Sequence, residues 1–156
     1  MVKLHTYSLA LRWSGADQGP TSSYESYSRD FAVEVPGKTD IAGSAESAFL
    51  GDDSRVNPEE MLLASLSSCH MLWYFHFCAD AGVLVTNYED APLGEMDAAA
   101  EGGGRFTKVV LHPTVTLAPG ADAELARDLH ESAHARCFIA NSVNFPVTCQ
   151  PTIVIA

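Results

Sequence analysis

Two segments near the N-terminus alternate hydrophobic and polar residues, the pattern of a strand with one face in water. They are KLHTYSLALRW (3–13) and YESYSRDFAVEV (24–35), and a stretch rich in turn-forming residues, SGADQGPTSS (14–23), lies between them. The pattern predicts an antiparallel hairpin. Residues 36–56 are rich in Gly, Pro, Ser and Asp and lack periodicity, so we expect an irregular crossover there.

A helix is predicted from Asn57 to about Ala81, starting in the stretch NPEEMLLASLSSC. Asn57 is a good N-cap, Pro58 suits the first helical position, and two glutamates follow at the positive end of the helix dipole. Hydrophobic residues then recur at spacings of three and four, which predicts a central buried helix. The predicted stripe is Leu62, Leu66, Cys69, Trp73 and Phe77, widened by Met61 and Leu63.

The remaining segments alternate between strand and helix patterns. Residues 81–90 predict a strand and turn, and 101–119 a glycine turn followed by a strand with Val109, Leu111 and Val115 on one face. Residues 121–137 carry Leu125, Leu129 and Ala133 at helical spacing, and 145–156 end the chain as a strand. This order predicts an α+β fold, and the length of 156 residues predicts a single domain over 1–156.

Charge and composition narrow the function classes. The net charge is -11 with nine basic residues, which argues against nucleic-acid binding because phosphate contacts use clustered Lys and Arg. The longest hydrophobic run, residues 71–85, is interrupted by His76 and Asp80, so we expect no membrane span. The N-terminus lacks the pattern of a signal peptide, and we therefore expect a cytoplasmic protein.

The chain has four cysteines, which we expect to be free or redox-active rather than a structural disulfide framework. Cys78 and Cys69 lie on opposite sides of the predicted helix, because nine residues separate them. Cys149 lies in a strand-like segment with no titratable residue close by in the sequence. Cys78 and Cys149 are both interpreted as packing residues. Cys69 and Cys137 each follow small residues and precede bulky ones. Neither belongs to a Cys-X-X-Cys motif, so only the fold could pair them.

The stretch NPEEMLLASLSSC resembles the signature of the OsmC/Ohr family of thiol peroxidases, in which a peroxidatic cysteine follows the Glu of Asn-Pro-Glu by ten residues, as Cys69 follows Glu59. The resemblance extends over nearly the whole chain, to the helix that leads to Cys137. Better-known members have proline directly after the second cysteine, and here Phe138 stands there, as in a less typical branch. The resemblance implies antiparallel sheets wrapped around the central helix, in an intertwined two-fold dimer.

The resemblance also implies an activity: reduction of organic hydroperoxides to alcohols, in defence against peroxide or osmotic stress. Cys69 would form a sulfenic acid, Cys137 would condense with it to a disulfide, and a small dithiol or protein thiol would reduce that disulfide. No cofactor or metal is implied. The aromatic residues expected to line an apolar substrate pocket are Trp73, Phe77, Phe138 and Phe145.

A reactive thiolate at Cys69 needs a cation beside it, because the helix dipole acts mainly in the first turn and the net charge is negative. The resemblance points to an arginine of the N-terminal sheet region, which here corresponds to Arg29. Arg12 and Arg55 remain alternatives. If Arg29 has only a structural role, it is a solvated strand residue paired loosely with Glu25 or Asp30.

Glu59 lies ten residues before Cys69 on one helix, about 15 Å along its axis at roughly 1.5 Å per residue. Both residues could not contact the same arginine in one straight helix. If Glu59 orients Arg29 toward a thiolate, that thiolate belongs to a second chain, which agrees with the implied dimer. Otherwise Glu59 is a charge that stabilises the helix start.

Two other hypotheses stay open. His130, His134 and Cys137 share one helix face at spacings of four and three, an arrangement that could hold a metal. The chain could also be a non-enzymatic small-ligand-binding or stress protein that retains the fold, because fold does not determine function. His70 and His76 lie on different faces and are interpreted as structural.

Overall fold

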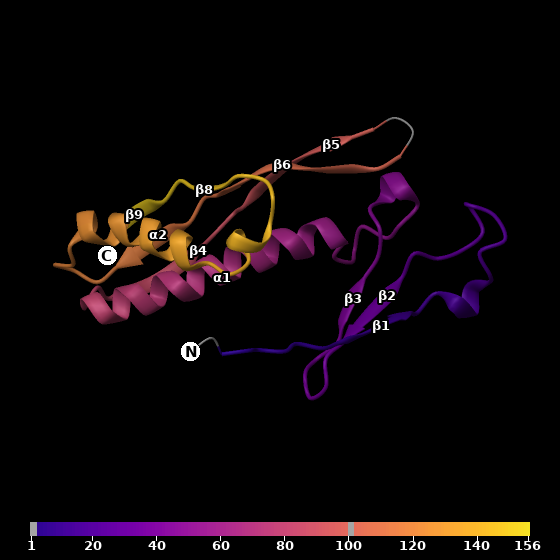
Figure 1. The fold of residues 1–156 in the computed structure, drawn as a ribbon, viewed down its shortest axis with the longest axis horizontal. Helices are drawn as coiled ribbons and strands as arrows, with labels where there is room; N and C mark the ends of the chain where they lie inside the picture. The colour runs from indigo at the N-terminus through magenta and orange to yellow at the C-terminus, as the bar shows by residue number, and fades with distance from the viewer. Residues whose placement is uncertain (1–2, 100–101) are drawn as a thin grey trace. The chain divides into compact units, whose positions relative to one another are not determined.

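The computed structural model describes residues 3–99 and 102–156. Its contacts divide the chain into two compact units, residues 1–61 and 62–156, and Figure 1 shows the elements of each. Helix α1 (Pro58–Ala81) begins at the end of the first unit and continues into the second. Each unit is described by itself below.

The first unit contains one three-stranded antiparallel sheet in the order β1-β2-β3. Its strands are β1 (Ala10–Trp13), β2 (Phe31–Glu34) and β3 (Ile41–Gly43), with short 3-10 turns at Ala16–Gln18 and Ser47–Phe49. Ala10 pairs with Glu34 and Trp13 with Phe31, which confirms the predicted hairpin, although both strands are shorter than their alternating segments. The prediction of an irregular crossover over 36–56 was wrong at β3, because pairing with β2 supplies the hydrogen bonds that the local sequence does not indicate.

Helix α1 begins and ends where the sequence predicts. Asn57 and Glu60 form a capping box: the Asn57 side chain accepts a hydrogen bond from the Glu60 amide at 2.8 Å, and the Glu60 carboxylate accepts one from the Asn57 amide at 3.0 Å. At the other end Gly82 has φ of 72°, the left-handed conformation that closes a helix and suits glycine. The capping box and Gly82 therefore set the two ends of the helix.

The second unit contains two three-stranded sheets in the orders β4-β7-β9 and β5-β6-β8. Two pairings are parallel, β6 with β8 and β7 with β9, so these sheets are mixed rather than wholly antiparallel as expected. The strands are β4 (Val85–Glu89), β5 (Leu93–Ala98), β6 (Gly104–Leu111), β7 (Thr114–Leu117), β8 (Val147–Cys149) and β9 (Thr152–Ile155).

Prolines explain why the second unit has more strands than the sequence patterns indicate. The segment 101–119 forms two strands, β6 and β7, separated at Pro113, and 145–156 forms β8 and β9, separated at Pro151. Proline lacks the amide hydrogen that a continuous ladder needs. Strand β5 was not predicted, and Glu101, where the expected glycine turn begins, lies outside the described residues. The α+β class and the order of helices and strands are confirmed.

The core of the second unit consists of two hydrophobic clusters. One includes Tyr74, Val115 and Leu117, and the other includes Leu66, Val109 and Leu111. Helix α1 supplies both clusters from a row of fully buried residues at every fourth position: Leu66, His70, Tyr74 and Cys78.

The buried row of α1 is not the predicted stripe. Leu66 belongs to both the predicted stripe and the buried row. Three other residues of the predicted stripe, Cys69, Trp73 and Phe77, are only half-buried. The fully buried residue is in each case the next one in the sequence: His70, Tyr74 and Cys78. Because α1 is apolar on several sides, its sequence does not indicate which side faces the core.

Helix α2 (Ala123–Arg136) begins at Asp122, whose side chain accepts hydrogen bonds from the amides of the next turn. It buries Ala126, His130 and Ala133, whereas Leu125, part of the predicted stripe, is exposed. A single 3-10 turn, Ala140–Ser142, follows it.

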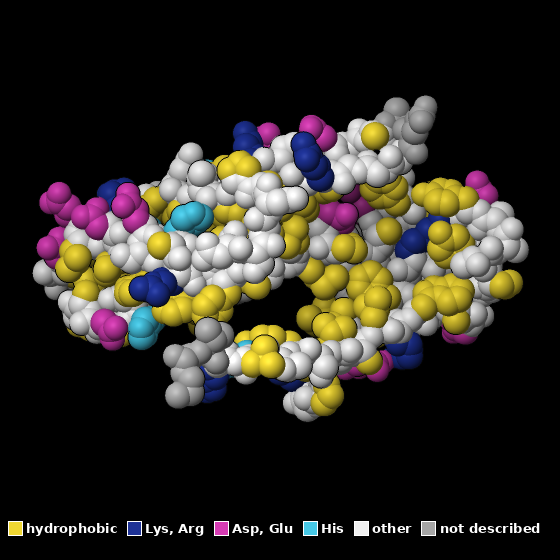
Figure 2. Space-filling view, viewed as in Figure 1, with side chains coloured by type: hydrophobic (Ala, Val, Ile, Leu, Met, Phe, Trp, Pro, Cys, Tyr) yellow, Lys and Arg dark blue, Asp and Glu magenta, His cyan; other side chains and the backbone are white. Residues whose placement is uncertain are grey.

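Hydrophobic side chains also reach the surface of each unit, between acidic and neutral polar ones (Figure 2). In the first unit the large exposed side chains include those of Leu4, Tyr7, Leu9 and Leu11. Within the described residues, no helix combines the length and the hydrophobicity that crossing a membrane requires.

Candidate active site

Two thiols from distant parts of the chain become neighbours in the second unit. Cys69 is half-buried in the middle of α1, and Cys137 is the buried residue at which α2 ends. The pKa of Cys137 is raised to about 11, chiefly by burial. The neighbouring Cys69 side chain contributes to this rise, and the Ala140 amide, which donates to the Cys137 sulfur at 3.4 Å, opposes it. All four cysteines are free thiols.

Three of the four aromatic residues expected at a substrate pocket lie in one group. The Trp73 ring contacts Phe138 edge-on with centroids 5.6 Å apart, and the Phe77 ring stacks on Trp73 at 5.8 Å. Phe138 is 66% exposed, so this group has an open side. Phe145 instead packs on Phe106, with centroids 5.5 Å apart, in the Leu66 cluster.

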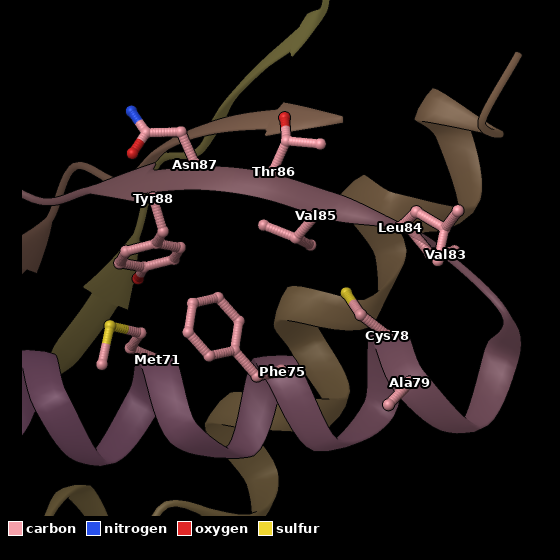
Figure 3. Close-up of a pocket in the computed structure, with 10 residues that line it drawn as sticks. All are labelled: Met71, Phe75, Cys78, Ala79, Val83, Leu84, Val85, Thr86, Asn87 and Tyr88. Carbon is pink, nitrogen blue, oxygen red and sulfur yellow. The ribbon is translucent and has the colours of Figure 1, made fainter. Parts of the chain in front are cut away.

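A hollow of about 540 Å³ lies between α1 and β4, and the sequence analysis did not predict it. Figure 3 shows Met71, Phe75 and Cys78 from α1 facing Val85 and Tyr88 from β4. Its lining is mostly apolar. The predicted pocket residues do not line this hollow.

In the first unit, Arg29 lies just before β2 rather than in a strand. Its guanidinium donates hydrogen bonds to the carbonyl oxygens of Tyr24 and Tyr27 and lies over both rings, 4.7 and 4.0 Å from their centroids. Within residues 3–99 and 102–156 no carboxylate comes within ion-pair distance of Arg29. Arg29 also borders a hollow of about 530 Å³.

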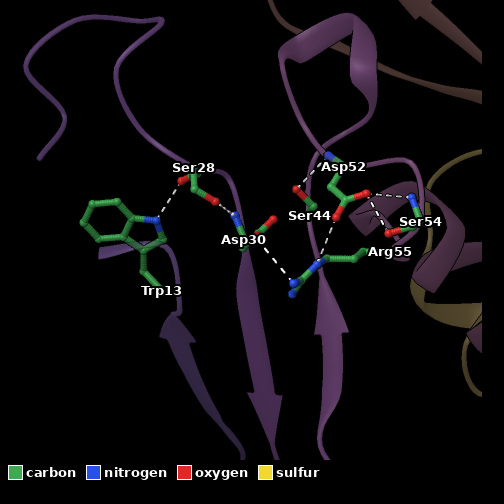
Figure 4. Close-up of polar contacts among 7 residues, drawn as sticks. All are labelled: Trp13, Ser28, Asp30, Ser44, Asp52, Ser54 and Arg55. Atoms are coloured by element: carbon green, nitrogen blue, oxygen red, sulfur yellow. Dashed lines mark hydrogen bonds and ion pairs between the residues drawn. The ribbon is translucent and has the colours of Figure 1, made fainter. Parts of the chain in front are cut away.

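The two alternative arginines are both paired with carboxylates. Arg12 binds Glu34 at 2.8 Å, and Arg55 lies 3.5 Å from Asp30 and 3.3 Å from Asp52 (Figure 4). The alternative that pairs Arg29 with Asp30 was therefore wrong, because Asp30 faces Arg55. Of the three candidate arginines, Arg29 is thus the one without an ion pair among the described residues.

Glu59 is exposed in the first turn of α1. It forms no ion pair with the described parts of the chain, and the capping box uses Glu60 instead. Among the described residues, the Glu59 carboxylate therefore takes part neither in an ion pair nor in the capping box.

The fold gathers a third group of reactive side chains that the sequence analysis missed: His70 of α1, His130 of α2 and Cys149 of β8. Nε2 of His70 lies 2.9 Å from Nδ1 of His130, and the Cys149 sulfur lies 3.6 and 3.7 Å from these two nitrogens. The metal hypothesis had combined His130 with His134 and Cys137, but His134 is exposed and belongs to no cluster of donors among the described residues.

No spacing signal connects these three residues, since each lies on a different element. One local signal was available: His70 belongs to the row of every fourth residue that contains Leu66 and Tyr74. Had that row been identified as buried, a histidine in the core would have stood out, because a buried polar side chain needs a partner.

Comparison with known proteins shows which family this chain resembles. A family model described as OsmC-like protein matches residues 51–152. An OsmC-like protein of unknown function from Vibrio cholerae has a structure similar to this one, with a TM-score of 0.85 and 32% identity, over 95% of this chain and 99% of that chain.

Two hydroperoxide resistance proteins share the fold at lower identity. The first, an organic hydroperoxide resistance protein OsmC from Legionella pneumophila, has a TM-score of 0.67 and 18% identity over 97% of this chain and 99% of that one. The second, an organic hydroperoxide resistance protein from Elizabethkingia anophelis, has a TM-score of 0.66 and 20% identity over the same shares, 97% and 99%. The search of curated proteins gave no match. From the matching model and the shared fold, the chain belongs to the family of OsmC-like proteins.

Proposed function

We propose that the protein is a cytoplasmic thiol peroxidase that reduces organic hydroperoxides, with Cys69 as the peroxidatic and Cys137 as the resolving cysteine. The observation that carries this proposal is the proximity of these two thiols, one on α1 and one at the end of α2. A two-cysteine cycle requires a second thiol close enough to attack the oxidised first one. The names of the two hydroperoxide resistance proteins agree with it.

In the first step the Cys69 thiolate attacks the outer oxygen of the hydroperoxide. The oxygen–oxygen bond breaks, the sulfur gains that oxygen as a sulfenic acid, and the alkoxide leaves as the alcohol after taking up a proton. Sulfur loses two electrons, which reduce the peroxide.

In the second step the Cys137 sulfur attacks the sulfenic sulfur, a disulfide forms, and water leaves. The raised pKa of Cys137 means that this thiol is protonated at neutral pH and gives up its proton as it attacks. A dithiol or a protein thiol then reduces the disulfide by exchange and restores both cysteines.

Arg29 is the best candidate for the cation that stabilises the thiolate and the developing alkoxide. Its two alternatives are neutralised by carboxylates, whereas its own guanidinium has only carbonyl and ring partners among the described residues. An arginine retains its charge when desolvated, and its fork fits two acceptors.

We further propose a two-fold dimer in which Glu59 and Arg29 of one chain complete the site around Cys69 of the other. Two features support it: Glu59 has no ionic partner in residues 3–99 and 102–156, and the first unit exposes large hydrophobic side chains such as Leu4 at 89% and Tyr7 at 87%. Exposed apolar groups of this kind favour burial against a second chain.

The group of aromatic side chains that includes Trp73 and Phe138 supports an organic peroxide as the substrate class. Trp73, Phe77 and Phe138 present apolar surface with an open side, which favours an organic peroxide over hydrogen peroxide. Phe145 packs on Phe106 in the hydrophobic core, so we propose a packing role for it and no contact with the substrate.

A second candidate function is non-enzymatic binding of a small apolar ligand. The hollow between α1 and β4, with Met71, Phe75 and Val85 in its wall, favours it. In that case Cys69→Ser would leave the biological effect of the protein intact.

The test is mass spectrometry of the reduced protein after one equivalent of cumene hydroperoxide, beside the same reaction with hydrogen peroxide. The expected product is a disulfide between the Cys69 and Cys137 peptides, formed faster with the organic peroxide, with Cys78 and Cys149 unmodified as internal references. In Cys137→Ser, Cys69 should stop at the sulfenic acid. If all four thiols survive both oxidants, the peroxidase proposal fails and ligand binding takes its place.

A further inference from the structure

The interior of the second unit contains a cluster of two imidazoles and a thiol that the proposed peroxidase chemistry does not use. The side chains of His70 and His130 are 0% and 2% exposed, and Cys149 is half-buried beside them. Three elements that are remote in sequence, α1, α2 and β8, each contribute one of these side chains. A cluster this polar in a hydrophobic core calls for a physical explanation.

The spacing of the donor atoms fits a single small metal ion. Their separations are 2.9 Å between the two nitrogens and 3.6 and 3.7 Å from the sulfur to each nitrogen. Zinc bonds of about 2.0–2.1 Å to nitrogen and about 2.3 Å to sulfur, at tetrahedral angles, separate the donors by roughly 3.3–3.6 Å. Binding would therefore move these atoms by only a few tenths of an ångström.

Hydrogen bonding within the protein leaves the cluster incomplete. A neutral imidazole has one N–H, so at most one ring donates to the other across the 2.9 Å contact. Nδ1 of His70, Nε2 of His130 and the hydroxyl of nearby Tyr88 are buried and have no hydrogen-bond partner among the described residues. Nδ1 of His70 and Nε2 of His130 are the nitrogens that the contact between the two rings does not use, so each can carry the ring N–H while the other nitrogen of the same ring presents its lone pair to an ion.

The local charge also favours a cation. Asp90 lies close enough for its negative charge to raise the pKa of His70 against the effect of burial and to add to the raised pKa of Cys149. Its carboxylate accepts hydrogen bonds from the His112 amide at 2.8 Å and from the Ser67 hydroxyl, but no cationic side chain of the described residues pairs with it. The two positive charges of a divalent ion would balance the negative charges of the Cys149 thiolate and of Asp90.

We propose that Nε2 of His70, Nδ1 of His130 and Sγ of Cys149 bind a divalent transition metal, with zinc as the expected ion. On binding, the thiol releases its proton to solvent and a metal–sulfur bond replaces the sulfur–hydrogen bond. The fourth position is left to water or to an external ligand. The ion would hold α1, α2 and β8 together, independently of the peroxidase reaction.

The test uses the tag-free, reduced, metal-stripped protein titrated with Co²⁺, whose bond to a thiolate gives a charge-transfer absorption. We expect one equivalent to bind, with an absorption that Zn²⁺ abolishes by displacement. Cys149→Ser should lose the thiolate absorption, whereas Cys69→Ser and Cys137→Ser should keep it. The site is overturned if less than a tenth of an equivalent binds, or if the absorption depends on Cys69 or Cys137.

Histidine variants test the other two ligands. His130→Gln and His70→Gln should weaken Zn²⁺ binding more than about tenfold, and His134→Gln, on the exposed face of α2, should not change it. Equal weakening by all three would contradict the assignment. Should any variant fail to fold, the wild-type protein still decides: Zn²⁺ should protect Cys149 from alkylation, mapped on peptides against Cys78, and no protection would overturn the site.

Discussion

Nε2 of His70 lies 2.9 Å from Nδ1 of His130, although the first residue belongs to α1 and the second to α2. The Tyr74 ring stacks on His130 with centroids 3.9 Å apart, and the Tyr74 hydroxyl donates to the Ala126 carbonyl at 3.1 Å. These contacts join the two helices of the second unit through polar groups inside its core. Both imidazoles must remain neutral there, because an imidazolium would lose its hydration.

The first prediction concerns acid stability. The pKa of His70 is lowered to about 4 and that of His130 to about 3, in each case chiefly by burial, whereas an unfolded histidine titrates near ~6.5. Below that value the unfolded chain binds more protons, so stability is lost as pH falls from about 6.5 toward about 4.

Urea unfolding of metal-free protein, followed by tryptophan fluorescence between pH 7.5 and 4.5, measures this loss. His130→Gln should lose less stability over this range than the wild type. His5→Gln, at an exposed position, should follow the wild type and serves as the control. Identical pH slopes for all three proteins would show that the buried pair does not set acid stability.

The second prediction concerns the resolving step of the proposed reaction. Since the pKa of Cys137 is raised to about 11, its thiolate fraction rises about tenfold for each pH unit in the range well below that value. Disulfide formation after Cys69 oxidation should accelerate with pH in the same proportion. Rapid mixing with one equivalent of peroxide, quenched with acid and analysed by peptide mass, gives the rate; a rate independent of pH would mean that another step is limiting.

The third prediction separates the arginines. Arg29→Gln should slow oxidation of Cys69 by about 10²-fold, the usual cost of losing one preorganised donor to a developing negative charge. Arg12→Gln should change the rate less than about twofold, because Glu34 already neutralises Arg12 on the surface. Stopped-flow kinetics with cumene hydroperoxide compare the two variants, and equal effects would remove Arg29 from the proposed site.

The fourth prediction concerns the core. Leu66 is fully buried on α1 against Val109 and Leu111, so Leu66→Ala should lower the free energy of unfolding by about 2–5 kcal/mol. Leu66→Met keeps the volume and should cost less than about 1.5 kcal/mol. Urea denaturation of both variants is the measurement, and similar values would contradict tight packing at this position.

The sequence by itself determined the features that depend on near neighbours in the chain. The start of α1 follows from Asn57, Pro58 and Glu60, since a capping box is formed by residues three positions apart. The hairpin of β1 and β2 follows from alternation and an intervening turn. The spacing of Glu59 and Cys69 likewise lies within one helix and pointed to the family that the comparisons then established.

The tertiary structure alone decided the features that depend on distant residues. Hydrogen bonds from other strands, rather than local pattern, produce β3 and the parallel pairings of β6 with β8 and β7 with β9. Packing selected the buried row of α1, because a helix that is apolar on several sides has no face marked by its sequence. The placement of Cys149 beside His70 and His130 required α1, α2 and β8 to meet, and that meeting is fixed by burial of the surrounding hydrophobic side chains.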